Sequence, residues 1–227
     1  LIAIAGGRRS QLFSPAVRKH WLKAAGLGFL NPFFYYTILF IAYDRLSAQS
    51  AQVINFTWPV FIVLLSIIWK KESPRPGGLL ALMISFLGAY TVITRGDYLG
   101  FNAEDGLGAA LALGSAVIWA VYWITNRSNP TDTLIWLLWI FTFGVIYVSI
   151  GGIFWFQPPD FSWGMVISGI YVGLFEMSLT FWVWLSALRA ARSTLLVSNL
   201  IYLTPFLSLW VIRLVLGETL RWSTVMG

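Results

Sequence analysis

One carboxylate stands out among the residues that could carry chemistry. Glu176 is the only charged residue in the 28-residue stretch Phe161–Leu188, which is long enough to cross a bilayer. A charged carboxylate at that depth costs about 2.5–3.5 kcal/mol, so Glu176 must face protein or a water-filled cavity, or carry a proton. On a helix it shares a face with Gly169, Gly173 and Thr180. Two interpretations stay open: a cavity group that titrates or meets a cation, and a structural carboxylate hydrogen-bonded to a neighbouring helix.

A proline followed thirteen residues later by a glutamate occurs twice. Pro59 precedes Glu72 and Pro205 precedes Glu218, so one offset of 146 residues superimposes both pairs. The offset aligns three further pairs of residues: Ser47 with Ser193, Phe56 with Tyr202, and Ser73 with Thr219. A helix used twice in one apolar chain predicts an internal duplication. The prolines could hinge their helices or shape them statically, and the glutamates could be functional or simply end their helices at the membrane surface.

Polar and aromatic residues also recur at helical spacing. Those that could line a central cavity together with Glu176 are Asn31, Tyr35, Gln52, Asn55, Trp58, Trp119, Tyr122, Thr180, Ser198, Asn199 and Tyr202. Asn31 and Tyr35, four residues apart, are expected on one face of a helix. Such stripes on several helices predict an enclosed, partly polar pathway. The alternative is a set of interhelical hydrogen bonds that hold the helices together, each worth about 0.6 kcal/mol.

The elements that position these residues are helices that cross a membrane. Hydrophobic residues make up 58% of the chain and charged residues 11%, whereas roughly a quarter of a soluble domain is charged. Seven stretches are uncharged, or interrupted only by Glu176: Ala24–Tyr43, Val53–Trp69, Gly77–Thr94, Gly106–Asn126, Thr133–Pro159, Phe161–Leu188 and Ser193–Ile212. The predicted fold class is therefore an all-α polytopic membrane protein.

The placement of basic residues predicts the orientation of these spans. If the connection Gly6–Lys23 is cytoplasmic and the sides alternate, eleven of the fifteen Lys and Arg residues lie on the cytoplasmic side. The other four are Arg45, Arg95, Arg213 and Arg221. This asymmetry follows the positive-inside rule. The net charge of +6 thus indicates a lipid bilayer, not nucleic acid, as the partner.

The duplication divides the chain near its longest predicted outer loop, Arg95–Asp105. We expect a first repeat over residues 1–100 and a second over residues 101–227. An odd number of helices in each half would invert one half relative to the other. Leu1–Ala5 resembles the end of a helix and Trp222–Gly227 the start of one, so we expect terminal helices to be missing or incomplete here. Five helices in each half, and ten in the full protein, is the simplest completion.

Two segments resemble the paired signature of EamA-type transporters of the drug/metabolite transporter superfamily. They are Asn55-Phe56-Thr57-Trp58-Pro59 with Lys71-Glu72, and Ser198–Pro205 with Leu216-Gly217-Glu218. The segment Trp182–Leu188 resembles the helix that precedes the second signature. The resemblance implies two inverted five-helix repeats with cytoplasmic termini. It also implies export of small metabolites, commonly amino acids.

These observations together predict a secondary transporter that works by alternating access in a membrane, which we expect to be the bacterial inner membrane. No GxxxxGK[ST] phosphate loop occurs, so the expected energy source is a proton or exchange gradient, with Glu176 as the proton carrier. A passive channel or scaffold is the alternative. An intramembrane lipid-modifying enzyme is less favoured, because the only histidine, His20, lies in a basic loop without catalytic partners. No cofactor or metal is expected, and the oligomeric state stays open.

Overall fold

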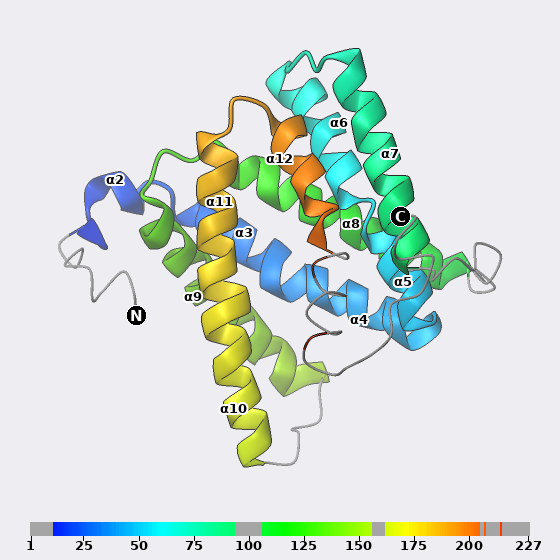
Figure 1. The fold of residues 1–227 in the computed structure, drawn as a ribbon. Helices are drawn as coiled ribbons and strands as arrows, with labels where there is room; N and C mark the ends of the chain where they lie inside the picture. Colours follow the sequence, from blue (N-terminus) through cyan, green and yellow to red (C-terminus); the bar gives the residue numbers. More distant parts are fainter. Residues whose placement is uncertain (1–10, 94–105, 156–161, 205–206, 208–213, 215–227) are drawn as a thin grey trace. The chain divides into compact units, whose positions relative to one another are not determined.

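Helices form almost the whole of the described chain. The computed structural model describes residues 11–93, 106–155, 162–204, 207 and 214, and this part contains no strand (Figure 1). The predicted all-α fold class is therefore confirmed. The chain separates into two compact units, each built from two distant stretches. The first unit comprises Leu1–Tyr35 and Thr125–Ala190, and the second comprises Tyr36–Ile124 and Ala191–Gly227.

Most of the predicted membrane spans coincide with long apolar helices. Within the described residues, five helices are long and apolar enough to cross a membrane: Trp21–Arg45, Ser50–Lys70, Gly106–Arg127, Thr133–Phe154 and Trp163–Ala190. A shorter apolar helix, Pro76–Gly88, falls in the predicted span Gly77–Thr94. The seventh predicted span, Ser193–Ile212, extends beyond the described residues. Composition alone thus locates the spans to within a few residues.

The first unit joins the start of the chain to its third quarter. Its helical elements are α2 (Pro15–Arg18), α3 (Trp21–Gly28), the π-helical segment η2 (Phe29–Phe34), α9 (Thr133–Trp155), α10 (Trp163–Tyr171), the π-helical segment η3 (Val172–Thr180) and α11 (Phe181–Ala190). The segments α3 and η2 pack on α9 through glycine. A Cβ atom on Gly28 would meet the Ile140 carbonyl oxygen, and one on Gly144 would meet the Pro32 ring. The two backbones therefore approach more closely than larger residues would allow.

The second unit holds the signature segments. Its helices are α4 (Tyr35–Arg45), which begins at the last residue of the first unit's N-terminal stretch, α5 (Ala48–Asn55), α6 (Trp58–Lys70), α7 (Pro76–Ile93), α8 (Gly106–Arg127), which runs on into the first unit, and α12 (Thr194–Ile201). Buried Ala42, Leu46, Ala51 and Ala112 join α4, α5 and α8 in one apolar cluster. Helix α12 packs on α6 and α7. The signature helices of both predicted repeats thus share one core.

Proline lies at the start of α6, not in its interior. The span Ser50–Lys70 breaks at Phe56 and Thr57, and Pro59 occupies the first turn of α6. A first-turn proline interrupts no helical hydrogen bond, because the N–H groups of that turn have no partner in the helix. The bend therefore precedes Pro59. The aligned Pro205 lies outside the described residues.

Helices α5 and α12 correspond residue by residue under the 146-residue offset. Adding 146 to the bounds of α5 gives the bounds of α12, and a serine, Ser47 or Ser193, stands at each N-cap position. Each helix ends in the same kind of turn: Thr57 N–H donates to the Ile54 carbonyl and Leu203 N–H to the Leu200 carbonyl, both at 3.1 Å. The aligned stretches therefore share local backbone structure as well as residue types.

Candidate functional site

Four aromatic side chains of the second unit form a contiguous cluster. The Trp58 ring at the start of α6 meets the Trp119 ring of α8 edge to face, with centroids 6.4 Å apart. Trp119 stacks on Tyr122 at 6.0 Å, and Tyr122 meets Trp123 at 5.0 Å. Aromatic pairs in these geometries add about 0.5–1.5 kcal/mol each beyond the area they bury. Trp58, Trp119 and Tyr122, predicted as cavity residues, thus lie together.

A polar contact ties the end of α5 to α8. The Asn55 side-chain amide donates to the Ser115 hydroxyl at 3.0 Å, and that hydroxyl donates to the Ala112 carbonyl at 2.7 Å. Ser115 is fully buried, one turn before Trp119. This bond is an interhelical contact of the kind that the alternative interpretation describes. It also fixes the end of α5 beside the aromatic cluster.

Helix α12 brings three predicted residues to the second unit. The Tyr202 hydroxyl makes a long hydrogen bond of 3.4 Å to the Phe56 carbonyl, and its ring lies 6.1 Å from that of Phe86. Ser198 Oγ and Asn199 Oδ1 are buried and have no hydrogen-bond partner in the described part of the chain. A buried polar atom without a partner costs about 1–3 kcal/mol, so these atoms are suited to bind a polar ligand group.

A cavity of about 520 Å³ lies in the second unit. Helices α5, α7 and α8, with the turn after α5, supply its lining: Val53, Ile54, Thr57, Phe86, Leu87, Tyr90, Ala109, Ala110 and Leu113. Phe86 belongs to the lining and also contacts Tyr202. The volume lies within the range of small-molecule sites. The lining is mostly apolar, with one hydroxyl each from Thr57 and Tyr90.

Asn31 is buried in the first unit, within η2. It departs from helical geometry, with φ −149° and ψ 124°, and its side-chain amide has no hydrogen-bond partner among the described residues. Proline at the next position disfavours the helical region, which explains the departure. The prediction that Asn31 and Tyr35 share one regular helical face is therefore wrong. A role of either residue in a cavity stays a prediction.

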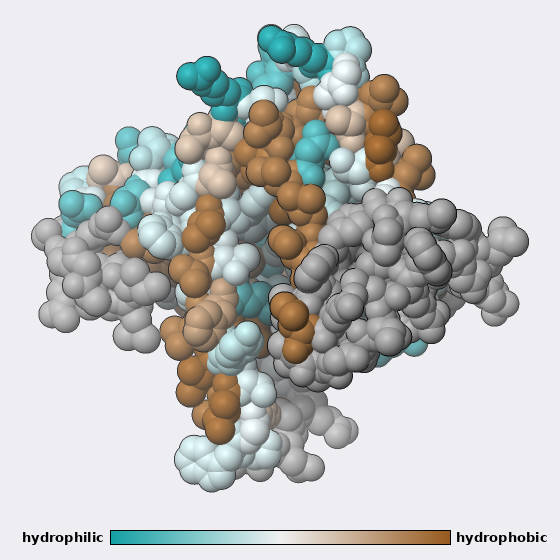
Figure 2. Space-filling model, in the orientation of Figure 1, coloured by the Kyte–Doolittle hydropathy of each residue, from teal (hydrophilic) through white to brown (hydrophobic). Residues whose placement is uncertain are grey.

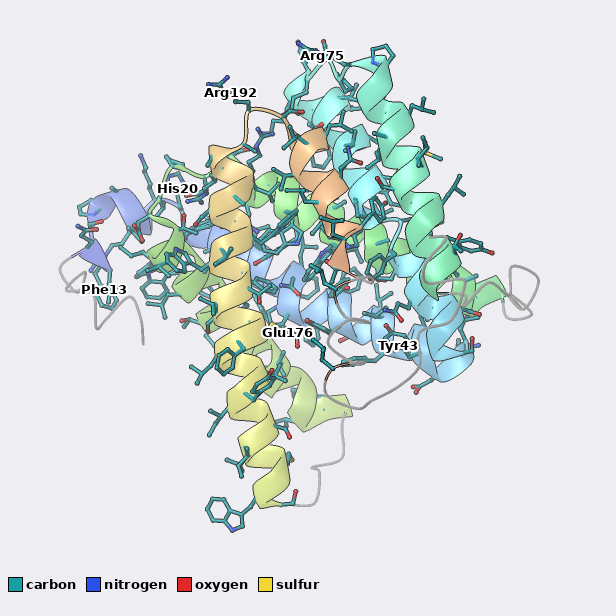
Figure 3. All side chains as sticks on the ribbon, viewed as in Figure 1. Phe13, His20, Tyr43, Arg75, Glu176 and Arg192 are labelled. Atoms are coloured by element: carbon teal, nitrogen blue, oxygen red, sulfur yellow. The ribbon has the colours of Figure 1, made fainter. Side chains whose placement is uncertain are left out.

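Glu176 and Thr180 are exposed in η3 (Figure 3). The Thr180 hydroxyl donates to the Phe175 carbonyl five residues earlier, at 2.8 Å. A Cβ atom on Gly169 or Gly173 would meet no atom within 4 Å among the described residues. Only 6% of the most apolar 18-residue stretch of this span is buried, and Figure 2 shows hydrophobic side chains along it. The Glu176 side is thus an open face, and both interpretations of the carboxylate stay predictions.

Glu72 caps a helix from the other predicted repeat. Its carboxylate accepts hydrogen bonds from the Thr194 backbone N–H at 3.2 Å and from the Thr194 hydroxyl at 3.0 Å. Lys71 has a left-handed backbone conformation, with φ 53°, and the Glu72 N–H donates to the Ser66 carbonyl. This turn at the end of α6 directs the Glu72 side chain to the start of α12. There the positive end of the helix dipole also stabilises a carboxylate. Glu218 lies outside the described residues, and Gln52 is exposed.

Two arginines of the first unit hold the α8–α9 connection to the end of α11. Arg189 donates to the Thr131 carbonyl at 2.8 Å, the Thr133 hydroxyl at 2.9 Å and the Asn126 carbonyl at 3.3 Å. Arg127 donates to the Leu188 carbonyl at 2.9 Å. Sequence reasoning counted both residues only as cytoplasmic charges. One feature of the sequence could have indicated this role: each arginine directly follows a long apolar run, and both lie on the same predicted side of the membrane.

The described residues contain no group of three or more His, Asp or Glu side chains that could hold a metal ion. The groups that the second unit gathers near the aromatic cluster are aromatic faces, hydroxyls and amides. Such groups suit an amphipathic small molecule.

Comparison with known proteins gives a consistent assignment. The model of the EamA-like transporter family matches residues 1–94 and 106–227. An uncharacterized transporter of Bacillus subtilis, YvbV, is 26% identical over 87% of this chain and 65% of its own length. The threonine/homoserine exporter RhtA of Salmonella typhimurium is 27% identical over 86% of this chain and 61% of its own length.

Two further similarities are more limited. The aromatic amino acid exporter YddG of Ancylobacter novellus is 30% identical over 47% of this chain and 36% of its own length. A solved crystal structure matches with a TM-score of 0.77 at 20% identity, covering 88% of this chain and 71% of that one. This likeness concerns the fold alone. The chain thus spans less than two thirds of the length of each of these three relatives: 65% of YvbV, 61% of RhtA and 36% of YddG.

Proposed function

We propose, because the chain belongs to the EamA-like transporter family, that it is part of a secondary transporter that exports small metabolites such as amino acids. The family match over both stretches is the observation that carries this proposal. The family indicates a multi-pass membrane protein and a transporter rather than an enzyme. Two relatives are named as exporters of amino acids, which supports that substrate class. We place the protein in the bacterial inner membrane.

The proposed architecture is two inverted five-helix repeats, ten helices in all, that open the substrate path alternately to each side. The two ranges of the family match, 1–94 and 106–227, fall within the proposed repeats, 1–100 and 101–227. The identical bounds of α5 and α12 under the offset support the duplication. Phe56 and Tyr202, which the offset aligns, also contact each other. In a twofold arrangement only residues near the axis touch their own equivalents.

Contacts within each unit support the proposed orientation. In the first unit, Arg189 and Thr131 bond to each other, and both lie in connections predicted to be cytoplasmic. In the second unit, Glu72, in a connection predicted to be cytoplasmic, bonds to Thr194, at the predicted cytoplasmic end of the span Ser193–Ile212. On the opposite side, a Cβ atom on Gly108 would meet Arg45 and Leu46. Residues assigned to one side by the charge pattern thus meet residues assigned to that side.

The substrate would bind at the cluster of Asn55, Trp58, Trp119, Tyr122 and Tyr202. Aromatic faces there would contact its apolar part. The unpartnered polar atoms of Ser198 and Asn199 would contact its polar part. Glu176 would carry the coupling proton, since it is the one charged residue of the stretch Phe161–Leu188.

Counterflow tests this proposal directly. The full-length protein, in proteoliposomes loaded with one unlabelled amino acid, should accumulate the same labelled amino acid transiently. A panel of amino acids with and without a pH gradient identifies the substrate. Asn199→Ala should lower the rate at least tenfold, whereas Leu200→Ala, an exposed neighbour on α12, should leave it unchanged. Flux without counterflow would instead identify a passive channel.

A further inference from the structure

A second cavity lies in the first unit. It measures about 400 Å³ and is lined by Gln11, Ser14, Ala16, Val17, Lys19, His20, Pro130, Thr131, Asp132 and Ile135. We call it the elbow pocket, because it lies beside the bend between α2 and α3. The proposed transport path does not use it.

Residues 11–20, which form one wall of the elbow pocket, pack on α9. Leu12, Val17 and Ile135 form a buried apolar cluster, and the Trp139 indole N–H donates to the Leu12 carbonyl at 3.1 Å. The ring of His20 meets that of Trp136 edge to face at 6.4 Å. The pocket is therefore built by packing between two segments far apart in the sequence.

The pocket is lined by one cationic side chain, Lys19, and one anionic side chain, Asp132. Asp132 is already engaged, because its Oδ1 accepts the Leu134 and Ile135 N–H groups at 3.0 and 3.3 Å and so caps α9. The Thr131 carbonyl accepts from Arg189, whose positive charge also lies close to Asp132. His20 Nε2 is buried and has no hydrogen-bond partner among the described residues. Lys19, exposed at the same pocket, adds an ammonium donor, and an anionic oxygen would satisfy both groups where Nε2 carries the ring proton.

The pocket also lies where two membrane spans begin, at Trp21 and Thr133. Aromatic rings gather there: Trp21 and Trp139 have centroids 4.6 Å apart, and Phe13 lies 5.5 Å from Trp139. Tryptophan clusters of this kind are typical of the bilayer interface. Figure 3 shows Phe13 and His20 at the two ends of α2. The mouth of the pocket is thus expected at the depth of lipid headgroups.

Exposed apolar side chains distinguish a lipid from a soluble anion. Phe13 is 54% exposed and Leu22 is 91% exposed, and both flank the basic residues of the elbow. Those basic residues are Arg18, Lys19 and Lys23. A soluble anion would use only the charges, whereas a phospholipid would use the charges for its phosphate and the apolar side chains for its acyl chains.

We infer that the elbow pocket binds the headgroup of an anionic phospholipid. The phosphate lies between Lys19 and His20, and the acyl chains run past Phe13 and Leu22 into the bilayer. Each basic residue near an anionic membrane surface contributes about fivefold in binding. The site does not depend on which substrate is carried.

Native mass spectrometry of the full-length protein, extracted in mixed micelles of phosphatidylglycerol and phosphatidylcholine, tests this inference. The wild type should retain phosphatidylglycerol in preference to phosphatidylcholine. Lys19→Gln should lower that retention about fivefold and Lys19→Arg should preserve it. His20→Gln should also lower the retention, because it removes the ring nitrogen proposed to bind the phosphate. Arg75→Gln is the matched control, because it removes an exposed charge from a connection on the same predicted side. Thermal unfolding of each variant separates lost lipid from lost folding.

Three results would overturn the inference. They are equal retention of both lipids by the wild type, an equal loss in Arg75→Gln, and stabilisation by inorganic phosphate that matches stabilisation by phosphatidylglycerol. The last result would identify a site for a free anion. None of these measurements uses transport, so failure of the lipid site and failure of the proposed function are distinguishable.

Discussion

At the scale of single residues, the signature glutamate Glu72 has a structural partner that the sequence does not reveal. The apolar run before Glu72 correctly predicts that this residue lies at the end of a span, and helix termination at the membrane surface is one of the two interpretations of it. The structure instead shows two hydrogen bonds to Thr194, 122 residues away. No local pattern records a contact of that separation. Residue types and spacing predict where a helix ends, whereas partners across the core depend on packing.

Replacing Glu72 should weaken the attachment of α12. Glu72→Ala removes both hydrogen bonds to Thr194 and leaves the Thr194 backbone N–H without this acceptor. We therefore expect the free energy of unfolding to fall by about 1 kcal/mol. The melting temperature of the full-length protein in detergent should fall by roughly 2–4 °C. Ser73→Ala, at the exposed neighbouring position, should leave it unchanged. Equal melting temperatures for the two variants would show that the Glu72 bonds contribute nothing.

At the scale of elements, the sequence locates the helices well but not their irregularities. Uncharged runs predict the spans because a bilayer selects for length and hydrophobicity. The break at Phe56 and Thr57 and the π-helical segments η2 and η3 were missed, since composition averaged over a span does not register them. The candidate cavity residues divide similarly. Trp58, Trp119 and Tyr122 meet in one cluster, whereas the expected helical pairing of Asn31 with Tyr35 fails at Pro32.

The glycine contact between η2 and α9 gives a prediction at this scale. A Cβ atom on Gly144 would overlap the Pro32 ring, whereas one on Gly152, on the same helix, would meet no described atom within 4 Å. Gly144→Ala should therefore cost about 1–3 kcal/mol through overpacking. Gly152→Ala should leave stability unchanged or raise it, because alanine favours the helix. Thermal unfolding of both variants compares them, and a stable Gly144→Ala protein would refute the close packing.

At the scale of the whole molecule, each packed unit draws on both halves of the sequence. The second unit combines α5 and α12, which the 146-residue offset aligns. Under the proposed internal duplication, each half would contribute helices to both units, and the two signatures would be neighbours. This arrangement would account for the contact of Phe56 with Tyr202 and of Glu72 with Thr194. The repeat pattern in the sequence indicates duplication, but only the packing shows which helices the halves share.

The coupling proposed for the whole transporter depends on Glu176, which has no acidic counterpart in the first repeat because the offset aligns it with Leu30. Glu176→Gln keeps the shape of the side chain and removes its ability to carry a proton. We expect uptake driven by a pH gradient to fall at least tenfold while counterflow of the same substrate persists, because exchange needs no net proton movement. Glu176→Asp should recover gradient-driven uptake in part, since it retains a carboxyl group. If Glu176→Gln transports with an unchanged response to the gradient, another group couples transport, and the carboxylate is structural.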